Sequence, residues 1–517
     1  MASQWQALPL EIKHMILEIV LLHSSKRHQK SAYAIVSKEW QTFFEKRIFH
    51  RLVLRQSSIV KFGQLIQHRR RELLQHLWLR IELPKYHRNA SEMRETNSEK
   101  TKNNQIVTKA VWQLLKILTS WEKDDTRLTL ELSVHSPSDS EYYLSDYCLD
   151  RDIYPRVDDE DCAYEEFYAH MSLKRRYYQV YDADGSYRQL QSHRIFARSL
   201  ELVKTRGKAG LPSVQVVKRL LIRRQYVCSF SPDTLLEIIR SLSGLESISL
   251  EADTVFKDGF GGKLGEYLQS TNSLKTLSIF DENDRLRLRR KSRNKLHPSL
   301  GVALANDSCL LEHLSIAFAI DAKDFFHDFW PGDPPVASPA ERHWLNPRTA
   351  DSAILKSAQT LYRAADEKWP ALRSLALTSA LLRPDSPRST INALLQAAAN
   401  AALQMPNLRL LEIWNYDKDL DFVYIFQYRR FGSNGCPTIT SSNTWGYNLE
   451  PHVVSSWSNV SNKHGGRDIR VQEQDIDLEG LCSKSYGSVV NHLQLRRLVL
   501  QPVSRCQLIW EAEIDNA

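Results

Sequence analysis

The stretch SLKTLSIF, residues 273–280, shows the pattern from which the architecture can be inferred: an apolar residue, two variable positions, a second apolar residue, one variable position and a third apolar residue. The same six-residue pattern starts at eight positions, namely Leu74, Val217, Leu245, Leu274, Leu311, Leu372, Leu408 and Leu495. From Val217 onward the starts lie 28, 29, 37, 61, 36 and 87 residues apart. The short steps fit one strand and one helix per repeat, and the longer steps indicate insertions.

Helical patterns fill the gaps between these predicted strands. SPDTLLEIIRSL at 231–242 and TINALLQAAANAALQM at 390–405 each predict a helix before the next strand, and RLTLELSV at 127–134 alternates like a further strand. A single strand and helix cannot bury their apolar edges alone, so stacked units favour a curved α/β solenoid with a parallel sheet on its concave side. The alternative is a general α/β domain with leucine-rich strands.

Residues 5–50 have a different, helical pattern. Pro9 fits the first turn of a helix in which Ile12, Ile16 and Ile19 recur at helical spacing. A second helix is predicted from the apolar positions Ala32, Val36, Trp40, Phe43 and Phe44. So short a segment cannot build a self-sufficient core, and its apolar faces therefore require a neighbouring domain or a partner.

These N-terminal residues resemble the F-box family. The resemblance rests on Leu8-Pro9-x-Glu11-Ile12, on Ile16-Leu17 one turn later, and on Val36-Ser37-Lys38-x-Trp40 in the later helix. It implies a substrate adaptor of a cullin-based ubiquitin ligase that packs on the linker protein Skp1 and reaches the cullin through it. The resemblance assigns Skp1 contacts to Leu8, Pro9, Ile12, Ile16, Leu17, Val36, Ser37, Trp40 and Phe44. The alternative is a helical hairpin that only caps the following domain.

The rest of the chain resembles the leucine-rich repeats that often follow an F-box, and the whole layout is similar to a group of uncharacterised fungal F-box proteins. We therefore expect an all-α F-box-like module at 5–50 and a leucine-rich-repeat-like body at 51–517. Insertions are predicted near 85–105, 136–210, 281–297, 321–365 and 415–485.

If the repeated apolar residues point inward, the positions beside them line the concave face, because strand side chains alternate. Tryptophan and arginine dominate binding hot spots in protein interfaces, and this face contains several of both. The candidate substrate-binding residues are Trp78, Arg80, Arg219, Arg223, His313, Glu412, Trp414 and Arg497.

Composition excludes several other classes of protein. The 517 residues include 69 Lys and Arg against 61 Asp and Glu, a mild excess of +8. The 7 Cys are an odd number without a CxxC pair, which favours a reducing compartment. Neither a signal sequence nor a run of about 20 apolar residues is present, so we expect a soluble intracellular protein, cytoplasmic or nuclear, without membrane contact.

The sequence offers no catalytic motif, metal-ligand spacing or cofactor motif. GFGGKLG at 259–265 lacks the ending of a phosphate-binding loop and predicts a turn before a helix. The basic run 285–295 could be a nuclear import signal, but it lacks the interleaved aromatic residues of a nucleic-acid site. An acidic run spans 138–166.

The expected function is therefore a non-catalytic adaptor that binds Skp1 and a protein substrate. Such a subunit would act by holding the substrate near the activated ubiquitin. The alternatives are a solenoid scaffold without a ligase role, which binds a protein or nucleic acid, and an enzyme whose site lies in the insertions.

Overall fold

The computed structural model describes residues 5–23, 27–91, 93–121, 127–142, 194, 198–203, 210–224, 229–251, 260–281, 298–332, 367–418, 420–430, 436–466, 468–477 and 485–515. Within them the chain is mixed α/β, as predicted, and is built around one large sheet. The acidic run 138–166 beyond residue 142 and the basic run 285–295 lie outside the described residues.

The described part of the large sheet has 12 strands whose spatial order follows the chain. The neighbours from β1 to β11 all pair in parallel, β12 is antiparallel to both β11 and β13, and β14 is parallel to β13. The strands are β1 (Arg51–Arg55), β2 (His76–Glu82), β3 (Leu128–His135), β5 (Val217–Ile222), β7 (Ser247–Leu250), β8 (Thr276–Phe280), β9 (His313–Ala317), β10 (Ser374–Thr378), β11 (Leu410–Asp417), β12 (Phe422–Arg429), β13 (Thr438–Asn443) and β14 (Arg470–Asp475). A small separate sheet pairs β4 (Ser199–Leu200) with β6 (Ser229–Phe230).

The six-residue pattern is explained by the strand register. In the copies from Leu74 to Leu408, the second apolar residue lies beside its counterpart on the next strand or beside Leu130 of β3, and all of these residues are buried. This row consists of Leu77, Leu130, Leu220, Ile248, Leu277, Leu314, Leu375 and Leu411. Each buried side chain of this size stabilises the fold by about 1.5–3 kcal/mol, so the row is a major source of the sheet's stability.

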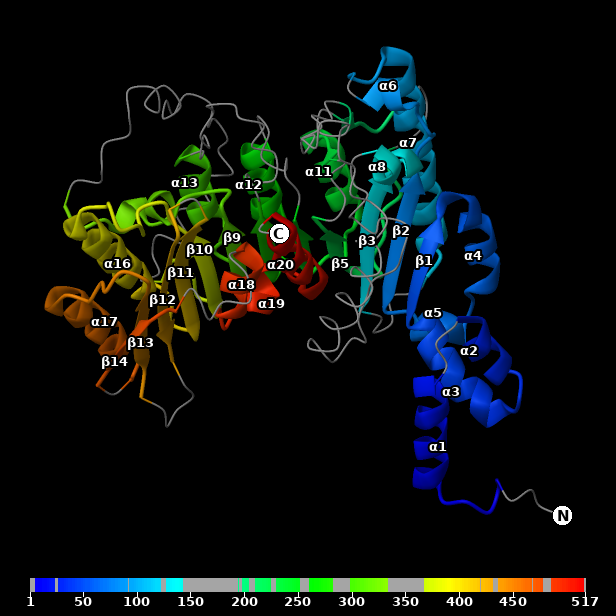
Figure 1. Ribbon diagram of the computed structural model, residues 1–517, viewed down its shortest axis with the longest axis horizontal. Coiled ribbons are helices and arrows are strands. Elements are labelled where there is room, and N and C mark those ends of the chain that lie inside the picture. Colours follow the sequence, from blue (N-terminus) through cyan, green and yellow to red (C-terminus); the bar gives the residue numbers. More distant parts are fainter. Residues whose placement is uncertain are drawn as a thin grey trace.

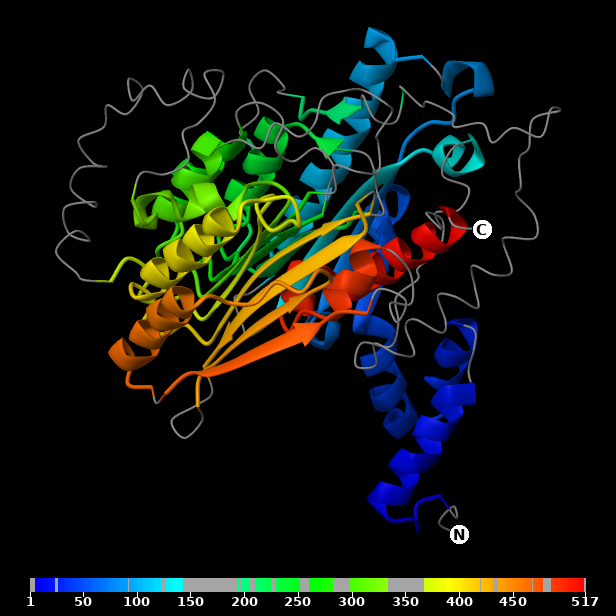
Figure 2. The same ribbon diagram turned by 60° about the vertical axis from the view of Figure 1, so that its left-hand side comes forward.

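Helices cover the outer face of the sheet, the face to which this leucine row points (Figure 2). They are α7 (Asn97–Leu118), α11 (Pro232–Ser241), α12 (Phe260–Ser270), α13 (Pro298–Asp307), α16 (Arg388–Ala402) and α17 (Pro451–Lys463). The predicted helices at 231–242 and 390–405 are α11 and α16. Ser231 caps α11 by accepting a hydrogen bond from the Thr234 backbone N–H.

Shorter helices join these elements. They are α4 (Ile59–Leu65), α5 (Arg69–Leu73), α6 (Arg88–Ser91), α8 (Pro137–Tyr142) and α14 (Ala322–Phe325), with the 3-10 turns η1 (Gln56–Ser58) and η2 (His327–Phe329). GFGGKLG, predicted as a turn, is helical from Phe260 onward and forms the first turns of α12.

Two sequence predictions are wrong. The copy that starts at Leu495 is not a strand, because it contains α19 (Arg496–Val499), and Leu495, Leu498 and Val499 also have helical spacing. The region 415–485 is not an insertion, because β12, β13 and β14 extend the sheet there. Near 85–105, where an insertion is also predicted, α7 begins at Asn97 and connects β2 to β3. The other predicted insertions lie largely outside the described residues.

The C-terminal segment, residues 485–515, returns across the opposite, inner face of the sheet (Figure 1). It contains α18 (Tyr486–Asn491), α19 and α20 (Pro502–Asp515). Beneath it the central inner positions are small and follow one register row: Ser249, Ser278, Ser315 and Ala376. Small side chains let a helix approach the sheet closely, and the Ser278 hydroxyl donates a hydrogen bond to the Leu498 carbonyl at 2.6 Å.

The N-terminal module, residues 5–49, extends away from the sheet below β1 (Figure 1). It contains α1 (Leu10–His23), α2 (Arg27–Tyr33) and α3 (Lys38–Phe49). Contacts with the sheet body run from α3 to α5 and β1. Most of the surface of α1 therefore lies outside the main core.

Candidate functional site

The N-terminal module exposes an unusual amount of apolar surface. On α1, Ile12, Met15 and Ile19 lie three and four residues apart, on one helix face, and all are exposed. The turn between α2 and α3 adds Ile35, which is 86% exposed, and Val36, which is 60% exposed. Exposed large apolar side chains that gather on one module mark interaction sites more often than single exposed side chains do.

An aromatic cluster packs beneath this surface and supports it. Phe44 is fully buried, and its ring centroid lies 5.3 Å from Tyr33 and 5.8 Å from Trp40. Leu17 of α1 is also buried. Ser37 caps α3 by accepting a hydrogen bond from the Trp40 backbone N–H. The module therefore has a small core of its own.

Charged pairs fix the helices of the module to one another and to the body. Arg47 of α3 pairs with Glu18 of α1 at 2.7 Å. Arg70 of α5 pairs with Glu45 at 2.8 Å and lies 4.8 Å from the centroid of the Phe49 ring. The exposed face is thus held at a defined place beside the sheet.

The nine residues assigned to Skp1 contacts fall into three groups. Pro9, Ile12, Val36 and Ser37 are exposed, and Leu8, Ile16 and Trp40 are half-buried. Leu17 and Phe44 are buried, so within this chain they support the surface from beneath. The assigned Skp1 contacts did not include Leu10, Met15, Ile19 or Ile35, although the spacing of these residues beside the other apolar residues was a visible signal.

The predicted open substrate face is mostly covered. Trp78, Arg80, Arg223, Glu412 and Trp414 are buried, Arg219 and His313 are half-buried, and Arg497 is exposed on α19. The prediction of one open concave surface is therefore wrong for the buried five. At Trp414, Phe318 and the C-terminal segment cover the face. The ring centroids of Phe318 and Trp414 lie 5.1 Å apart, and those of Phe318 and Tyr486 lie 4.8 Å apart.

Two buried glutamates attach the C-terminal segment to the sheet. Glu412 accepts hydrogen bonds from the backbone N–H groups of Gln494 and Leu495, just before α19. Glu251 accepts from the Gln501 N–H at 2.6 Å and from the Ser504 hydroxyl at the start of α20. A carboxylate at a helix N-terminus satisfies unpaired N–H groups and complements the helix dipole. Burial nevertheless raises the pKa of both carboxyls.

A third buried carboxylate, Glu131, lies toward the other end of the inner face. Arg223 donates to it at 2.6 Å and His76 lies 2.8 Å away. Burial alone would raise the pKa of Glu131, but Arg223, His76 and Arg51 outweigh it and lower the pKa to about 2. The Trp78 indole N–H donates to the Ser133 hydroxyl on the neighbouring strand. This part of the inner face is a paired polar core.

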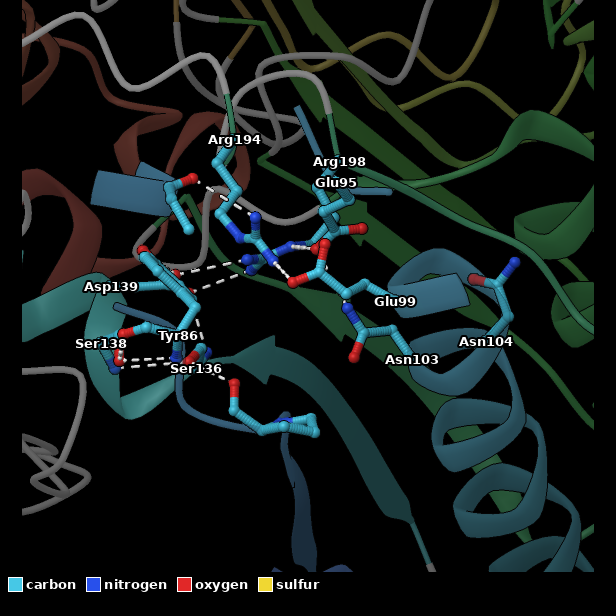
Figure 3. A network of polar contacts seen from close by, with 12 residues as sticks. Tyr86, Glu95, Glu99, Asn103, Asn104, Ser136, Ser138, Asp139, Arg194 and Arg198 are labelled. Atoms are coloured by element: carbon cyan, nitrogen blue, oxygen red, sulfur yellow. Dashed lines mark hydrogen bonds and ion pairs between the residues drawn. The ribbon is translucent and has the colours of Figure 1, made fainter. Parts of the chain in front are cut away.

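A further polar network lies where β2 and β3 end (Figure 3). Arg198 donates to both carboxyl oxygens of Asp139 and to Glu95, and the Tyr86 hydroxyl donates to Asp139 at 2.9 Å. Burial, followed by the Asp139 charge, raises the pKa of Tyr86, which keeps its hydroxyl protonated. Arg194 pairs with Glu99 at the start of α7. The network joins Arg194 and Arg198 to Tyr86, Glu95 and Glu99 and to the segment 136–139.

The network in Figure 3 has its charges paired and its carboxylates hydrogen-bonded, so it is built to hold segments together. Within the described ranges, no three His, Cys, Asp or Glu side chains gather as a metal site. In the same ranges, no helix has the length and apolar character to cross a bilayer.

Comparison with known proteins gives one family match. Residues 269–501 match the model of a family of unknown function, DUF6546. That stretch runs from the end of α12 through β14 and includes α18 and α19, ending directly before α20. No curated protein matches the chain. The family therefore assigns no activity to this region.

Proposed function

We propose that this chain is the substrate-recognition adaptor of a Skp1–cullin–F-box ubiquitin ligase. In this proposal the N-terminal module is an F-box that docks on a Skp1-like linker protein and, through it, on a cullin. The sheet body, a leucine-rich-repeat-like solenoid extended by antiparallel strands, binds the protein substrate. The chain itself would supply no catalytic group.

The exposed apolar surface of the N-terminal module is the observation that carries the proposal. Ile12, Met15 and Ile19 on α1 and Ile35 and Val36 before α3 are held by a rigid aromatic cluster, yet they remain exposed in the isolated chain. Such a surface gains stability when a partner covers it, at about 25 cal/mol for each Å² of apolar area. The repeat-like reading of the body is supported by its chain-ordered parallel strands.

An adaptor of this kind acts by proximity. A substrate held beside a ubiquitin-charged enzyme reacts as if the two were one molecule, which raises the local concentration to the millimolar range or higher. Affinity and shape are then sufficient, and the described polar clusters keep a structural role.

Co-purification with Skp1 tests the docking. The double variant Leu8→Ala/Pro9→Ala should co-purify with no more than about one tenth of the Skp1 that the unchanged chain retains, because the substitutions remove the turn that positions α1. Val60→Ala is the matched control, since Val60 is an exposed apolar residue on α4, outside the module. Equal retention of Skp1 by the double variant and the control would contradict the proposed docking.

A further inference from the structure

The C-terminal segment leaves the last part of the inner face uncovered. A groove of about 750 Å³ lies over β12, β13 and β14, with His492 and Gln494 of the C-terminal segment lining it. Its floor is made of side chains that point away from the core, because Ile439, Ser441 and Asn443 of β13 are buried on the outer side. The groove lies on the same side of the sheet as the predicted binding residues, but on strands that the sequence analysis assigned to an insertion.

The floor of the groove is polar and ordered by the strand register. Gln427, Thr440 and Gln472 lie side by side in one row, and Ser442 lies beside Gln474 in the next. Thr440 donates to the Gln472 side-chain oxygen, and Ser442 to that of Gln474, each at 3.4 Å. Among the described residues, the side-chain amide nitrogens of Gln472 and Gln474 have no hydrogen-bond partner, so both offer N–H donors to a ligand.

The backbone of β14 is also available along one edge. β14 is the terminal strand in the described part of the sheet (Figure 2). All six of its residues are exposed. The Arg470 N–H donates to the Pro437 carbonyl, and the Ile476 N–H donates to the Asn443 carbonyl. Because a parallel strand uses alternate residues for each neighbour, the N–H groups of Val471, Glu473 and Asp475 point away from β13.

The charges on this edge select the partner. Glu473 and Asp475 lie at the outward-bonding positions, so an antiparallel pair of two copies centred on Glu473 would place like charges opposite each other, which is destabilising. A strand with basic side chains at alternate positions would instead meet opposite charges. Its intervening side chains would lie beside Gln472 and Gln474.

We propose that β14 and the groove beside it bind an extended segment of a partner protein, which adds to the sheet as a further strand. The segment carries Lys or Arg opposite Glu473 and Asp475 and hydroxyl or amide side chains over the groove. Strand addition of this kind takes affinity from backbone hydrogen bonds and specificity from alternate side chains. The claim that this segment belongs to the adaptor's substrate rests on the proposed function. The binding of a basic extended peptide at β14 does not depend on it.

Fluorescence anisotropy with two labelled ten-residue peptides tests the proposal. One peptide alternates Lys with Thr and the other alternates Glu with Thr, and both are titrated with the purified full chain at about 0.15 M salt. The chain has a net charge of +8, so non-specific attraction favours the Glu peptide. We expect the Lys peptide to bind at least about fivefold more tightly. Equal binding, preference for the Glu peptide, or no binding up to about 1 mM would overturn the proposal.

Two variants then test the binding mode. Val471→Pro removes an outward-pointing N–H without removing a hydrogen bond to β13, and should weaken binding of the Lys peptide at least about tenfold. The control Val471→Ala keeps that N–H and should bind the Lys peptide with an affinity within about twofold of the unchanged chain. Asp475→Lys leaves the backbone intact and should abolish the preference for the Lys peptide. Unchanged binding by Val471→Pro, or an unchanged preference in Asp475→Lys, would contradict strand addition. Since Skp1 is absent, these results are independent of the docking test.

Discussion

Glu131, Glu251 and Glu412 are buried on the same inner face, yet their surroundings shift their pKa values in opposite directions. Arg223 and His76 hold the pKa of Glu131 at about 2, well below its usual value of 4.5. Glu251 and Glu412 are bound mainly by neutral donors, so burial dominates and raises the pKa of each. The ionised form of Glu131 therefore stabilises the fold, whereas ionisation of the other two is costly.

The substitution Glu131→Gln should lower the free energy of unfolding by about 3 kcal/mol near pH 7, because it leaves Arg223 buried without its countercharge. In the unchanged chain, the stability contributed by Glu131 is fully present above pH 4.5 and is lost as the pH falls toward 2. Urea unfolding between pH 3 and 7 measures both effects.

The control for this prediction is Glu266→Gln, since Glu266 is largely exposed and pairs weakly with Arg240 at 3.8 Å. It should change the free energy of unfolding by less than about 1 kcal/mol. A Glu131→Gln variant that is as stable as this control at pH 7 would contradict the stabilising role of the buried pair.

None of these carboxylates could be selected from the sequence as a buried group. The alternation of side chains along a strand places Glu131 and Glu412 on the inner face. A residue on that face is buried if another segment packs over it and can bind a ligand if none does, and the strand pattern does not distinguish the two cases. For Glu251 that cover arrives from Gln501 and Ser504, about 250 positions later in the chain. Such contacts leave no periodic signal.

At the scale of elements, the row Ser249, Ser278, Ser315 and Ala376 explains how the C-terminal segment packs against the sheet. Ser278→Leu should destabilise the protein by about 1–3 kcal/mol, because the larger side chain overpacks the contact between β8 and α19. It should also speed proteolytic cleavage within residues 485–515. Urea unfolding followed by limited proteolysis measures both changes.

Ser455→Leu provides the comparison, because Ser455 is exposed on α17, on the other side of the sheet. This variant should keep the original cleavage rate and stability within about 0.5 kcal/mol. If Ser278→Leu behaves like Ser455→Leu, the small-residue row does not determine how the segment packs.

Most of the strands could be predicted, because each six-residue copy from Leu74 to Leu408 belongs to a strand whose leucines align with those of its neighbours. The copy at Leu495 failed, since apolar residues three and four apart also fit a short helix. The strands β12, β13 and β14 were missed because they do not repeat that pattern. FVYIFQYR at 422–429 was nevertheless a visible strand signal, rich in aromatic and β-branched residues.

At the scale of the whole molecule, three surfaces have different roles. The outer helices and the C-terminal segment cover the two faces of the sheet (Figure 1). The groove at β14 lies at one end of the strand order, and the exposed apolar face of the N-terminal module lies beside the other end. The two accessible surfaces lie at opposite ends of the strand order, beside β1 and at β14. This separation would let an adaptor hold its linker and its substrate at the same time.

Calorimetric titration of purified Skp1 into the purified full chain tests the proposed adaptor role most directly. We predict one-to-one binding with a Kd of about 1 μM or lower, and at least about tenfold weaker binding by Ile12→Asp/Val36→Asp, whose side chains are 41% and 60% exposed. Val60→Asp, at an apolar position on α4 that is 63% exposed, should bind like the unchanged chain. Absence of binding at about 100 μM, or equal binding by Ile12→Asp/Val36→Asp, would contradict the account.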